Sequence, residues 1–278
     1  MPSEFLNVFP NGLVLVREHT EGEATYTLRD MYGNIIMTTL YDKLFYLPLD
    51  NQDHDYGYRV TKGDLLGILN SNGKTLLPVI YEEIGRYDDA AEEEQGAYNK
   101  FTDPFFPVKR RGYWTFVRKE DYKEFTPAYK TILCSYKQGF AAVQDKPTEL
   151  IFVNQEGREI WNIDTGYTFM YAEYIGNHYA LVSKLRGNAA AGTCGIYDLD
   201  AECLVVPTEY GIEFVDYDPD TRKTYLRIDG NPVAFKEGYF VDPADYRTCP
   251  NYAEIIEDYK PRRRLDENGK LVNIYGQG

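Results

Sequence analysis

A string of eighteen residues, GILNSNGKTLLPVIYEEI (Gly67 to Ile84), recurs along this chain and limits its fold more than any other feature. Moved back by forty positions it aligns without a gap with TLRDMYGNIIMTTLYDKL (27–44). Moved forward it fits GIYDLDAECLVVPTEYGI (195–212) after one inserted residue. Weaker or shorter copies occupy 115–132, 152–160 and 265–272. A unit of short apolar strands and turns that returns at a period near forty predicts a repeat protein.

The centre of the unit is an Asp or Asn three positions before a glycine. At the first position of a type I turn such a side chain caps the backbone, and glycine takes the following left-handed position at little steric cost. The combination predicts a short hairpin with a bulge. The pairs are Asp30 and Gly33, Asn70 and Gly73, Asn154 and Gly157, and Asp266 and Gly269.

One copy departs from this turn. Asp198 is followed by Ala201 where the other copies have glycine. Forcing alanine into the left-handed conformation costs on the order of 1 kcal/mol, so we expect a different turn there. The inserted residue before Pro207 agrees with that expectation.

The period of the repeat sets the fold class. About forty residues of short strands and turns are what a four-stranded propeller blade needs. We therefore predict a single all-β repeat domain over 1–278, a β-propeller of about six blades, with a linear stack of β-hairpins as the alternative. The 26 tyrosines agree with β structure, because Tyr suits half-buried pleated surfaces. Two segments differ: 88–104 reads as an exposed acidic insertion, and 251–260 as a helix of about two turns.

The residues of the opening string resemble the WG (KWG) repeat of bacterial proteins. That pattern has a Gly-aromatic/aliphatic-Ile-Asp strand, a Gly-Lys turn, an apolar strand and an Ile-Pro-x-x-Tyr-Asp-x-Ile ending. GFAAV (139–143) looks like the Gly-Leu-Ala-x-Val strand that follows it. The Trp that names the repeat is absent, since Leu66 and Cys194 precede Gly67 and Gly195. The resemblance implies an interaction module without assigned chemistry.

The charge of the chain excludes some partners. The net charge is −14, whereas a nucleic-acid binder usually has a basic footprint. We therefore expect neither nucleic acid nor a membrane as a partner. The N-terminus has no signal-peptide pattern, and no run of eighteen apolar residues occurs. The four cysteines are scattered without a Cys-x-x-Cys pair, so we predict reduced thiols and a cytoplasmic protein.

Motifs for catalysis or metal binding are missing from the sequence. His19, His54 and His178 share no metal spacing. DYDPDTRKTY (216–225) has alternating acids but lacks the glycine and the final acid of a calcium loop, so it reads as a hairpin turn. Cys134 with a distant His178 is a weak nucleophile pair. We expect no catalytic residue, no metal and no cofactor.

Two groups of aromatic residues call for different interpretations. Repeat-phased tyrosines end the unit at the same place and are predicted to pack between blades: Tyr41, Tyr81, Tyr129 and Tyr210. The segment RRGYWTF instead sets Arg110, Arg111, Tyr113 and Trp114 side by side, and Arg, Tyr and Trp are enriched at interface hot spots. These four are the predicted binding residues, although Tyr113 and Phe116 also fit alternating core positions of a strand.

The functional prediction is a non-enzymatic scaffold that binds a protein or peptide. Acidic loops favour a basic partner, and the net charge speeds capture of a cation. An effector, a regulator or an immunity protein that neutralises a basic toxin fits this description. The alternative is a glycan-binding or glycan-hydrolysing propeller, in which aromatic rings stack on sugars and two carboxylates act as catalysts.

Overall fold

The computed structural model describes residues 3–9, 11–19, 24–39, 41–49, 56–85, 104–184, 193–241, 263–265 and 271–273. Within these residues every regular element is a β-strand. The strands form six four-stranded sheets and one two-stranded sheet, and neighbouring strands are antiparallel. The prediction of an all-β repeat chain with about six four-stranded blades is confirmed.

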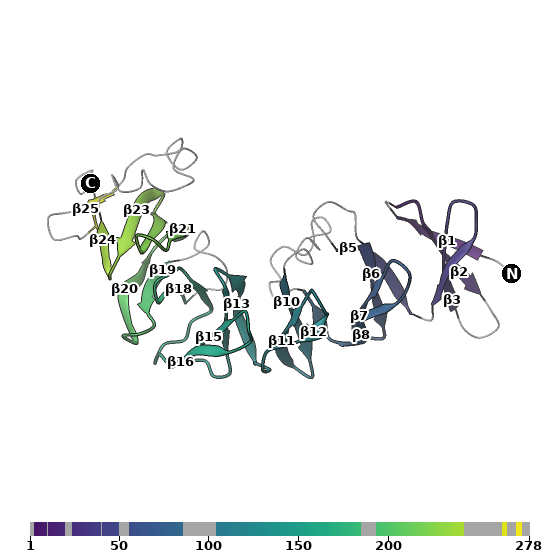
Figure 1. The fold of residues 1–278 in the computed structure, drawn as a ribbon, viewed down its shortest axis with the longest axis horizontal. Coiled ribbons are helices and arrows are strands. Elements are labelled where there is room, and N and C mark those ends of the chain that lie inside the picture. The colour runs from purple at the N-terminus through teal and green to yellow at the C-terminus, as the bar shows by residue number, and fades with distance from the viewer. Residues whose placement is uncertain are drawn as a thin grey trace. The chain divides into compact units, whose positions relative to one another are not determined.

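We number the four-stranded sheets 1 to 6 in chain order. In each sheet the strands follow one another along the chain, and each pairs with its neighbours in sequence (Figure 1). The chain divides into two compact units, Met1–Ala128 and Tyr129–Gly278. Sheets 1 to 3 belong to the first unit, and sheets 4 to 6 and the two-stranded sheet belong to the second.

The strands of the first unit are β1 (Ser3–Val8), β2 (Val14–His19), β3 (Ala24–Arg29), β4 (Ile35–Thr39), β5 (Lys43–Pro48), β6 (Tyr56–Lys62), β7 (Leu65–Asn70), β8 (Thr75–Tyr81), β9 (Glu83–Ile84), β10 (Phe105–Arg110), β11 (Tyr113–Arg118) and β12 (Lys123–Glu124). The strands of the second unit are β13 (Thr131–Lys137), β14 (Phe140–Gln144), β15 (Glu149–Asn154), β16 (Glu159–Asp164), β17 (Tyr171–Tyr174), β18 (Tyr179–Ser183), β19 (Cys194–Asp198), β20 (Cys203–Tyr210), β21 (Ile212–Asp218), β22 (Lys223–Ile228), β23 (Asn231–Lys236), β24 (Tyr239–Val241), β25 (Arg263–Leu265) and β26 (Leu271–Asn273).

The repeated string forms the third and fourth strands of its sheet. The strong copies lie on β3–β4, β7–β8 and β19–β20, and the copy at 152–160 lies on β15–β16. The weak copy at 115–132 begins on β11 and includes β12, and 265–272 runs from β25 to β26. The signature therefore encodes the hairpin of the third and fourth strands in sheets 1, 2, 4 and 5 and, in weak form, in sheet 3, whereas sheet 6 has no copy of it.

The turn of the repeat has the capped geometry that its sequence predicts. Oδ1 of Asn70 accepts hydrogen bonds from the backbone N–H groups of Asn72 (3.1 Å) and Lys74 (2.8 Å). Gly73 lies in the left-handed region at φ 79°, and its N–H donates to the carbonyl of Asn70 (2.9 Å). Asp30 and Asn154 bond the residues two and four positions on in the same way, with Gly33 at φ 86° and Gly157 at φ 77°.

The divergent copy has a different turn, as expected. Oδ1 of Asp198 accepts from the N–H groups of Asp200 (3.0 Å) and Ala201 (2.9 Å). The left-handed conformation falls on Glu202 (φ 53°), one position later than the glycine of the other copies. Because of the inserted residue, Ala201 does not adopt the left-handed conformation.

A second glycine of the repeat is required by a close backbone approach. A Cβ at Gly195 would lie 2.3 Å from the carbonyl oxygen of Val206, and one at Gly67 would lie 2.9 Å from that of Leu77. The register of both strand pairs shifts at this point, which marks a bulge. Glycine therefore precedes the buried Ile196 and Ile68 because no side chain fits there.

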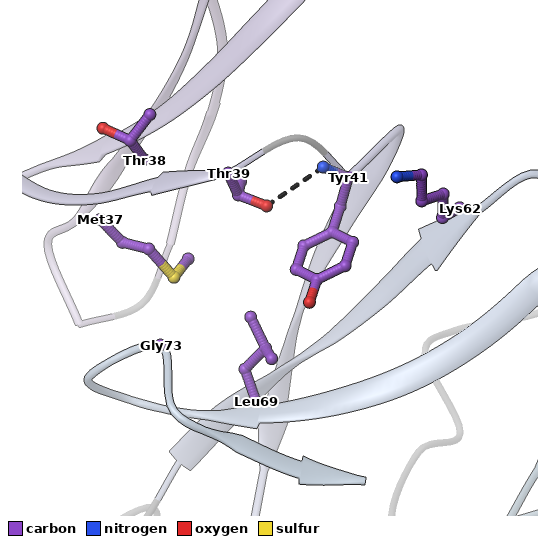
Figure 2. Close-up of a pocket in the computed structure, with 7 residues that line it drawn as sticks. All are labelled: Met37, Thr38, Thr39, Tyr41, Lys62, Leu69 and Gly73. Atoms are coloured by element: carbon purple, nitrogen blue, oxygen red, sulfur yellow. Dashed lines mark hydrogen bonds between the residues drawn. The ribbon is translucent and has the colours of Figure 1, made fainter. Parts of the chain in front are cut away.

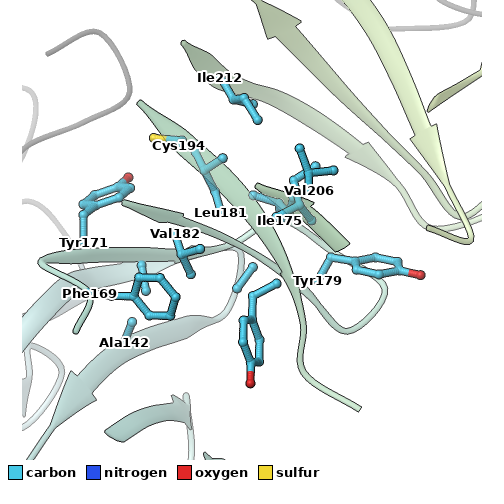
Figure 3. Close-up of a cluster of buried hydrophobic side chains, with 14 of the residues drawn as sticks. Ala142, Phe169, Tyr171, Ile175, Tyr179, Leu181, Val182, Cys194, Val206 and Ile212 are labelled. Carbon is cyan, nitrogen blue, oxygen red and sulfur yellow. The ribbon is translucent and has the colours of Figure 1, made fainter. Parts of the chain in front are cut away.

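Each unit has its own hydrophobic core. In the second unit one cluster joins buried side chains of sheets 4, 5 and 6, such as Ala142, Leu181 and Ile212 (Figure 3). In the first unit one cluster packs sheets 1 and 2 together around Tyr58, and another joins sheets 2 and 3 around Phe106. Apolar burial between adjacent sheets is the main stabilising contribution in both units.

Two repeat tyrosines donate hydrogen bonds to the fourth strand of the sheet that follows them in the chain. Oη of Tyr81, at the end of β8, donates to Oε1 of Glu124 on β12 (2.9 Å). Oη of Tyr129 donates in the same way to Oε1 of Glu159 on β16 (3.0 Å). Both rings are buried, whereas Tyr41 and Tyr210 are half-buried.

Several predictions concern residues outside the described part of the chain. These are the acidic insertion at 88–104 except for Pro104, the helix at 251–260, and the turn residues Asp266 and Gly269. Residues 216–225 are described and form the hairpin between β21 and β22, as predicted. There Oδ1 of Asp218 accepts from the N–H of Asp220 (2.9 Å).

Candidate functional site

The predicted binding residues lie on the hairpin between β10 and β11. Arg111 (φ 54°) and Gly112 (φ 78°) form its two-residue turn, and positive φ at both positions is the pattern of a type I′ turn. The ladder sets Lys109 opposite Trp114 and Arg110 opposite Tyr113. The geometry presents Arg111 to solvent at the tip of the hairpin.

The four predicted residues do not form one surface. Successive side chains of a strand point to opposite faces, and Tyr113 is 45% exposed whereas Trp114 is 7% exposed. Nζ of Lys109 lies 5.3 Å from the centroid of the Trp114 ring. Nη2 of Arg110 lies 3.5 Å from Oε2 of Glu124. Arg110, Arg111 and Tyr113 face solvent, but Arg110 is paired with Glu124, so one unpaired cation and one ring leave a small contact area.

A larger group of aromatic rings lies at the seam between sheets 4 and 5. Trp161 on β16 stacks on Tyr174 of β17, with the ring centroids 5.7 Å apart and the planes at 28°. Phe140 on β14 packs against both, with centroid distances of 5.5 Å to Trp161 and 4.5 Å to Tyr174. All three rings are partly exposed, and the buried Phe152 supports them from beneath. The rings thus form a rigid apolar surface that solvent reaches.

Two carboxylates and a histidine border these rings. Nε1 of Trp161 donates to Oδ1 of Asp200 (2.9 Å), and Nδ1 of His178 lies 3.5 Å from Oδ2 of the same carboxylate. Nε2 of His178 lies 3.7 Å from Oδ2 of Asp198. The Asp200 side chain is 63% exposed and the His178 side chain 30%. We call this group the Trp161 patch; its members are Phe140, Trp161, Tyr174, His178, Asp198 and Asp200.

The backbone fixes the parts of the Trp161 patch that come from sheet 5. His178 lies in the turn between β17 and β18, with φ at 61°, and its carbonyl accepts from the N–H of Leu199 (2.8 Å). Its own N–H donates to Oη of Tyr174 (3.4 Å). Burial raises the pKa of Tyr174, so this phenol stays neutral at physiological pH. The carboxylates are therefore the anionic groups of the patch.

The chemistry of the Trp161 patch suits a cationic side chain. Aromatic faces attract ammonium and guanidinium groups, and a neighbouring carboxylate supplies a charge-assisted hydrogen bond. Oδ1 of Asp200 already accepts the indole N–H, yet each carboxylate oxygen has a second lone pair. An arginine or lysine of a partner can therefore contact a ring and an acid together.

The sequence contained no clear signal for this patch. Trp161 lies four positions after Gly157, in phase with Leu77 and Met37 of the other copies, so the out-of-phase criterion that selected Trp114 does not select it. The neighbouring arginines drew attention to Trp114, whereas the partners of Trp161 are distant in the chain: Phe140 and Tyr174 come from other strands, and Asp200 from the divergent turn. Only the antiparallel pairing and the packing of sheet 4 on sheet 5 bring them together.

A buried polar cluster in the same unit is structural. The carboxylate of Glu173 on β17 accepts a hydrogen bond from the Tyr171 hydroxyl and lies 3.3 Å from Nζ of Lys137. A buried charge needs such a partner, and this one is satisfied. Among the described residues no three His, Cys, Asp or Glu side chains are grouped so as to hold a metal ion. Within the same residues there is no helix long and apolar enough to cross a membrane.

Comparison with known proteins finds similarity to solved structures alone. No protein-family model and no curated protein sequence matches the chain. Among the solved structures, Hsv2 of Kluyveromyces lactis is 9% identical, with 81% of this chain and 71% of that chain covered and a TM-score of 0.35. BamB from Moraxella catarrhalis is 11% identical, with 81% and 68% covered and a TM-score of 0.33. BBS1N, solved in complex with ARL6DN, is 12% identical, with 86% and 79% covered and a TM-score of 0.33. Because these TM-scores are low, the fold is defined by the strand pairing of this chain and not by its similarity to other structures.

Proposed function

We propose that this chain is a non-enzymatic protein-binding scaffold of WG-like repeats, and that it captures a basic protein through the Trp161 patch. The observation that carries the proposal is the pairing of the Trp161 indole with the Asp200 carboxylate beside two further rings. Trp and Tyr dominate interface hot spots because they bury a large area at a small cost in side-chain entropy.

The charge of the whole chain supports the same partner. A net charge of −14 attracts a cationic protein over distances of about one Debye length, roughly 8 Å at physiological salt, and speeds encounter. An effector, a regulator or a toxin-neutralising immunity protein would use such steering. We place this function in the cytoplasm, on the basis of the scattered cysteines.

The hairpin predicted from sequence is the competing surface. Arg111 and Tyr113 remain candidates there, but a cation at the tip of a hairpin would oppose a basic partner. The two surfaces belong to different compact units, so each can be altered alone. Variants at the two places therefore distinguish them.

The test is capture of partners from native lysate by the tagged full chain, washed first at low and then at high salt. We expect a stoichiometric basic protein that is retained at low salt and released at high salt. Asp200→Lys, which reverses an exposed charge, should lose this protein, and Trp161→Phe should retain less of it than the wild type. Tyr113→Ala is the matched control on the other surface and should behave as the wild type.

Three outcomes would refute the proposal. A partner that is acidic or indifferent to salt contradicts the electrostatic basis. Capture that survives Asp200→Lys but fails with Tyr113→Ala moves the site to the hairpin. An empty eluate, followed by binding to a glycan array, supports the alternative of a glycan-binding protein.

A further inference from the structure

The fourth strand of sheet 1 is an edge that has a bulge at Ile36 but neither a charge nor a proline. β4 has the sequence Ile35-Ile36-Met37-Thr38-Thr39, with no charge and no proline. In the described part of the chain it pairs with β3 alone. Ile35 is 54% exposed and Ile36 45% exposed. Natural edge strands normally carry charges, prolines or bulges, because an unpaired row of N–H and C=O groups invites another strand.

The equivalent strands of other sheets do have such protection. In the hydrogen-bonded register Met37 faces Leu28, Leu77 faces Ile68, and Val206 faces Ile196, so the three strands can be compared position by position. The residue after each is Thr38 in β4, but Pro78 in β8 and Pro207 in β20. β16 begins and ends with the acids Glu159 and Asp164, and β12 has only two residues. β4 is therefore distinct among copies of the same unit.

A cleft of about 350 Å³ opens beside this edge. It lies between sheets 1 and 2 of the first unit, and Figure 2 shows its lining. The residues that line it are Met37, Thr38, Thr39, Tyr41, Lys62, Leu69 and Gly73. The Met37 thioether, the Leu69 side chain and the Tyr41 ring supply the apolar part of its lining, the two threonines and Lys62 add polar groups, and none of the lining residues has a carboxylate. A chain running along β4 would therefore lie beside a cleft in which only one part is apolar.

Lys62 supplies a single charge at this cleft. It is the last residue of β6 and is exposed, and among the described residues it forms no ion pair. An ammonium beside an uncharged edge favours a carboxylate on an incoming strand. Side chains two positions apart on that strand share a face, so one can enter the cleft while the next reaches Lys62.

We propose that β4 and this cleft form a docking site for an extended peptide segment that carries an apolar residue and, two positions away, an Asp or Glu. The segment adds a fifth strand to sheet 1, with affinity from main-chain hydrogen bonds and specificity from the cleft and Lys62. This site is separate from the Trp161 patch, lies in the other compact unit and selects the opposite charge.

The experiment is fluorescence anisotropy of labelled eight-residue peptides with the full chain. The peptides alternate Thr and Val around a central Leu, with Glu two positions before or after the Leu; matched peptides have Lys in place of Glu. We expect saturable binding of one Glu peptide. Its Lys counterpart loses the ion pair with Lys62 and gains a repulsion, so its dissociation constant should be about tenfold higher. Lys62→Glu should reverse this preference, and Lys130→Glu, an exposed lysine of the second unit, should leave it unchanged.

Thr38→Pro tests the edge itself. Proline follows the aligned residue in β8 and β20, where the strand pairing is interrupted, whereas Thr38 pairs with Thr27. Thermal unfolding therefore first establishes that Thr38→Pro is folded, and the folded variant should lose peptide binding. Equal binding of Glu and Lys peptides, or binding that survives Thr38→Pro, would overturn the proposal. A wild-type dimer in sedimentation that Thr38→Pro converts to a monomer would overturn it as well, since a second copy then occupies the edge.

Discussion

Nε1 of Trp161 donates a 2.9 Å hydrogen bond to Oδ1 of Asp200, so a ring of sheet 4 is held by a carboxylate on a turn of sheet 5. The bond consumes the only polar atom of the indole and leaves its exposed surface apolar. Trp114, the other tryptophan, is buried in sheet 3 beneath Lys109. The two indoles therefore differ in solvent exposure, and a ligand at the Trp161 patch should change the exposure of Trp161 alone.

Single-tryptophan variants should separate the two indoles. In Trp114→Phe the remaining Trp161 should be quenched by acrylamide more strongly than Trp114 is in Trp161→Phe. An arginine-rich peptide should then reduce quenching in Trp114→Phe and leave Trp161→Phe unaffected. Protection of both tryptophans, or of neither, would contradict binding at the Trp161 patch.

Removing the hydroxyl of a repeat tyrosine should destabilise the chain. Tyr129→Phe leaves the carboxylate of Glu159 without its 3.0 Å donor at a buried ring, and the free energy of unfolding should fall by about 1–2 kcal/mol. Urea unfolding followed by circular dichroism measures this loss. Tyr113→Phe removes a hydroxyl from a 45% exposed ring and serves as the control, with no change expected.

Substitutions in the two kinds of turn should act in opposite directions. Gly33 has φ 86° with no atom within 4 Å of an added Cβ, so Gly33→Ala should cost about 1 kcal/mol from backbone strain alone. Glu202 is a non-glycine residue at φ 53°, so Glu202→Gly should relieve backbone strain. The free energy of unfolding should rise by only a few tenths of a kcal/mol, because the larger entropy of glycine in the unfolded chain offsets most of that relief. Thermal unfolding of the two variants checks both signs. A loss of stability with Glu202→Gly would show that the divergent turn is not strained.

Buried tyrosines should make the fold sensitive to alkali. Burial raises the pKa of Tyr58 to about 12 and that of Tyr179 to about 12, above the value near 10 of an unfolded tyrosine. Each folded pKa is raised, so the stability linked to these groups is complete below pH 10 and is lost as the pH rises from 10 through 12. Tyrosinate absorbance should therefore show a late phase, above pH 10, that comes from the buried tyrosines.

Tyr58→Phe checks that assignment. It should remove absorbance from the late phase alone. If all tyrosines ionised in a single step near pH 10, the described burial of Tyr58 would be wrong.

The hairpins of this fold were accessible to sequence reasoning because their determinants are local. Asn70 and Gly73 lie three residues apart, and the side-chain cap and left-handed glycine need nothing beyond the turn itself. The shifted turn at Asp198 followed from the same steric argument applied to Ala201. Period and strand content then led to about six four-stranded sheets.

The candidate site was not accessible in this way because its determinants are long-range. Phe140, Trp161 and Tyr174 meet through strand pairing and the packing of two sheets. At RRGYWTF, adjacency in sequence suggested a joint surface, yet the pleat turns Tyr113 and Trp114 to opposite faces. Neighbours along a strand are thus poor evidence for a shared site, and residues two apart are better.

The direction of the tyrosine bonds bears on how the chain folds as it is synthesised. Tyr81 donates forward to Glu124 and Tyr129 donates forward to Glu159, so the acceptor always leaves the ribosome after the donor. At synthesis rates of about 5–20 residues per second, Glu124 is synthesised several seconds after Tyr81, and the hydrogen bond cannot form before then. The contact between sheets 2 and 3 is therefore completed only when β12 emerges, and a nascent chain stalled before that point would expose it to chaperones and proteases.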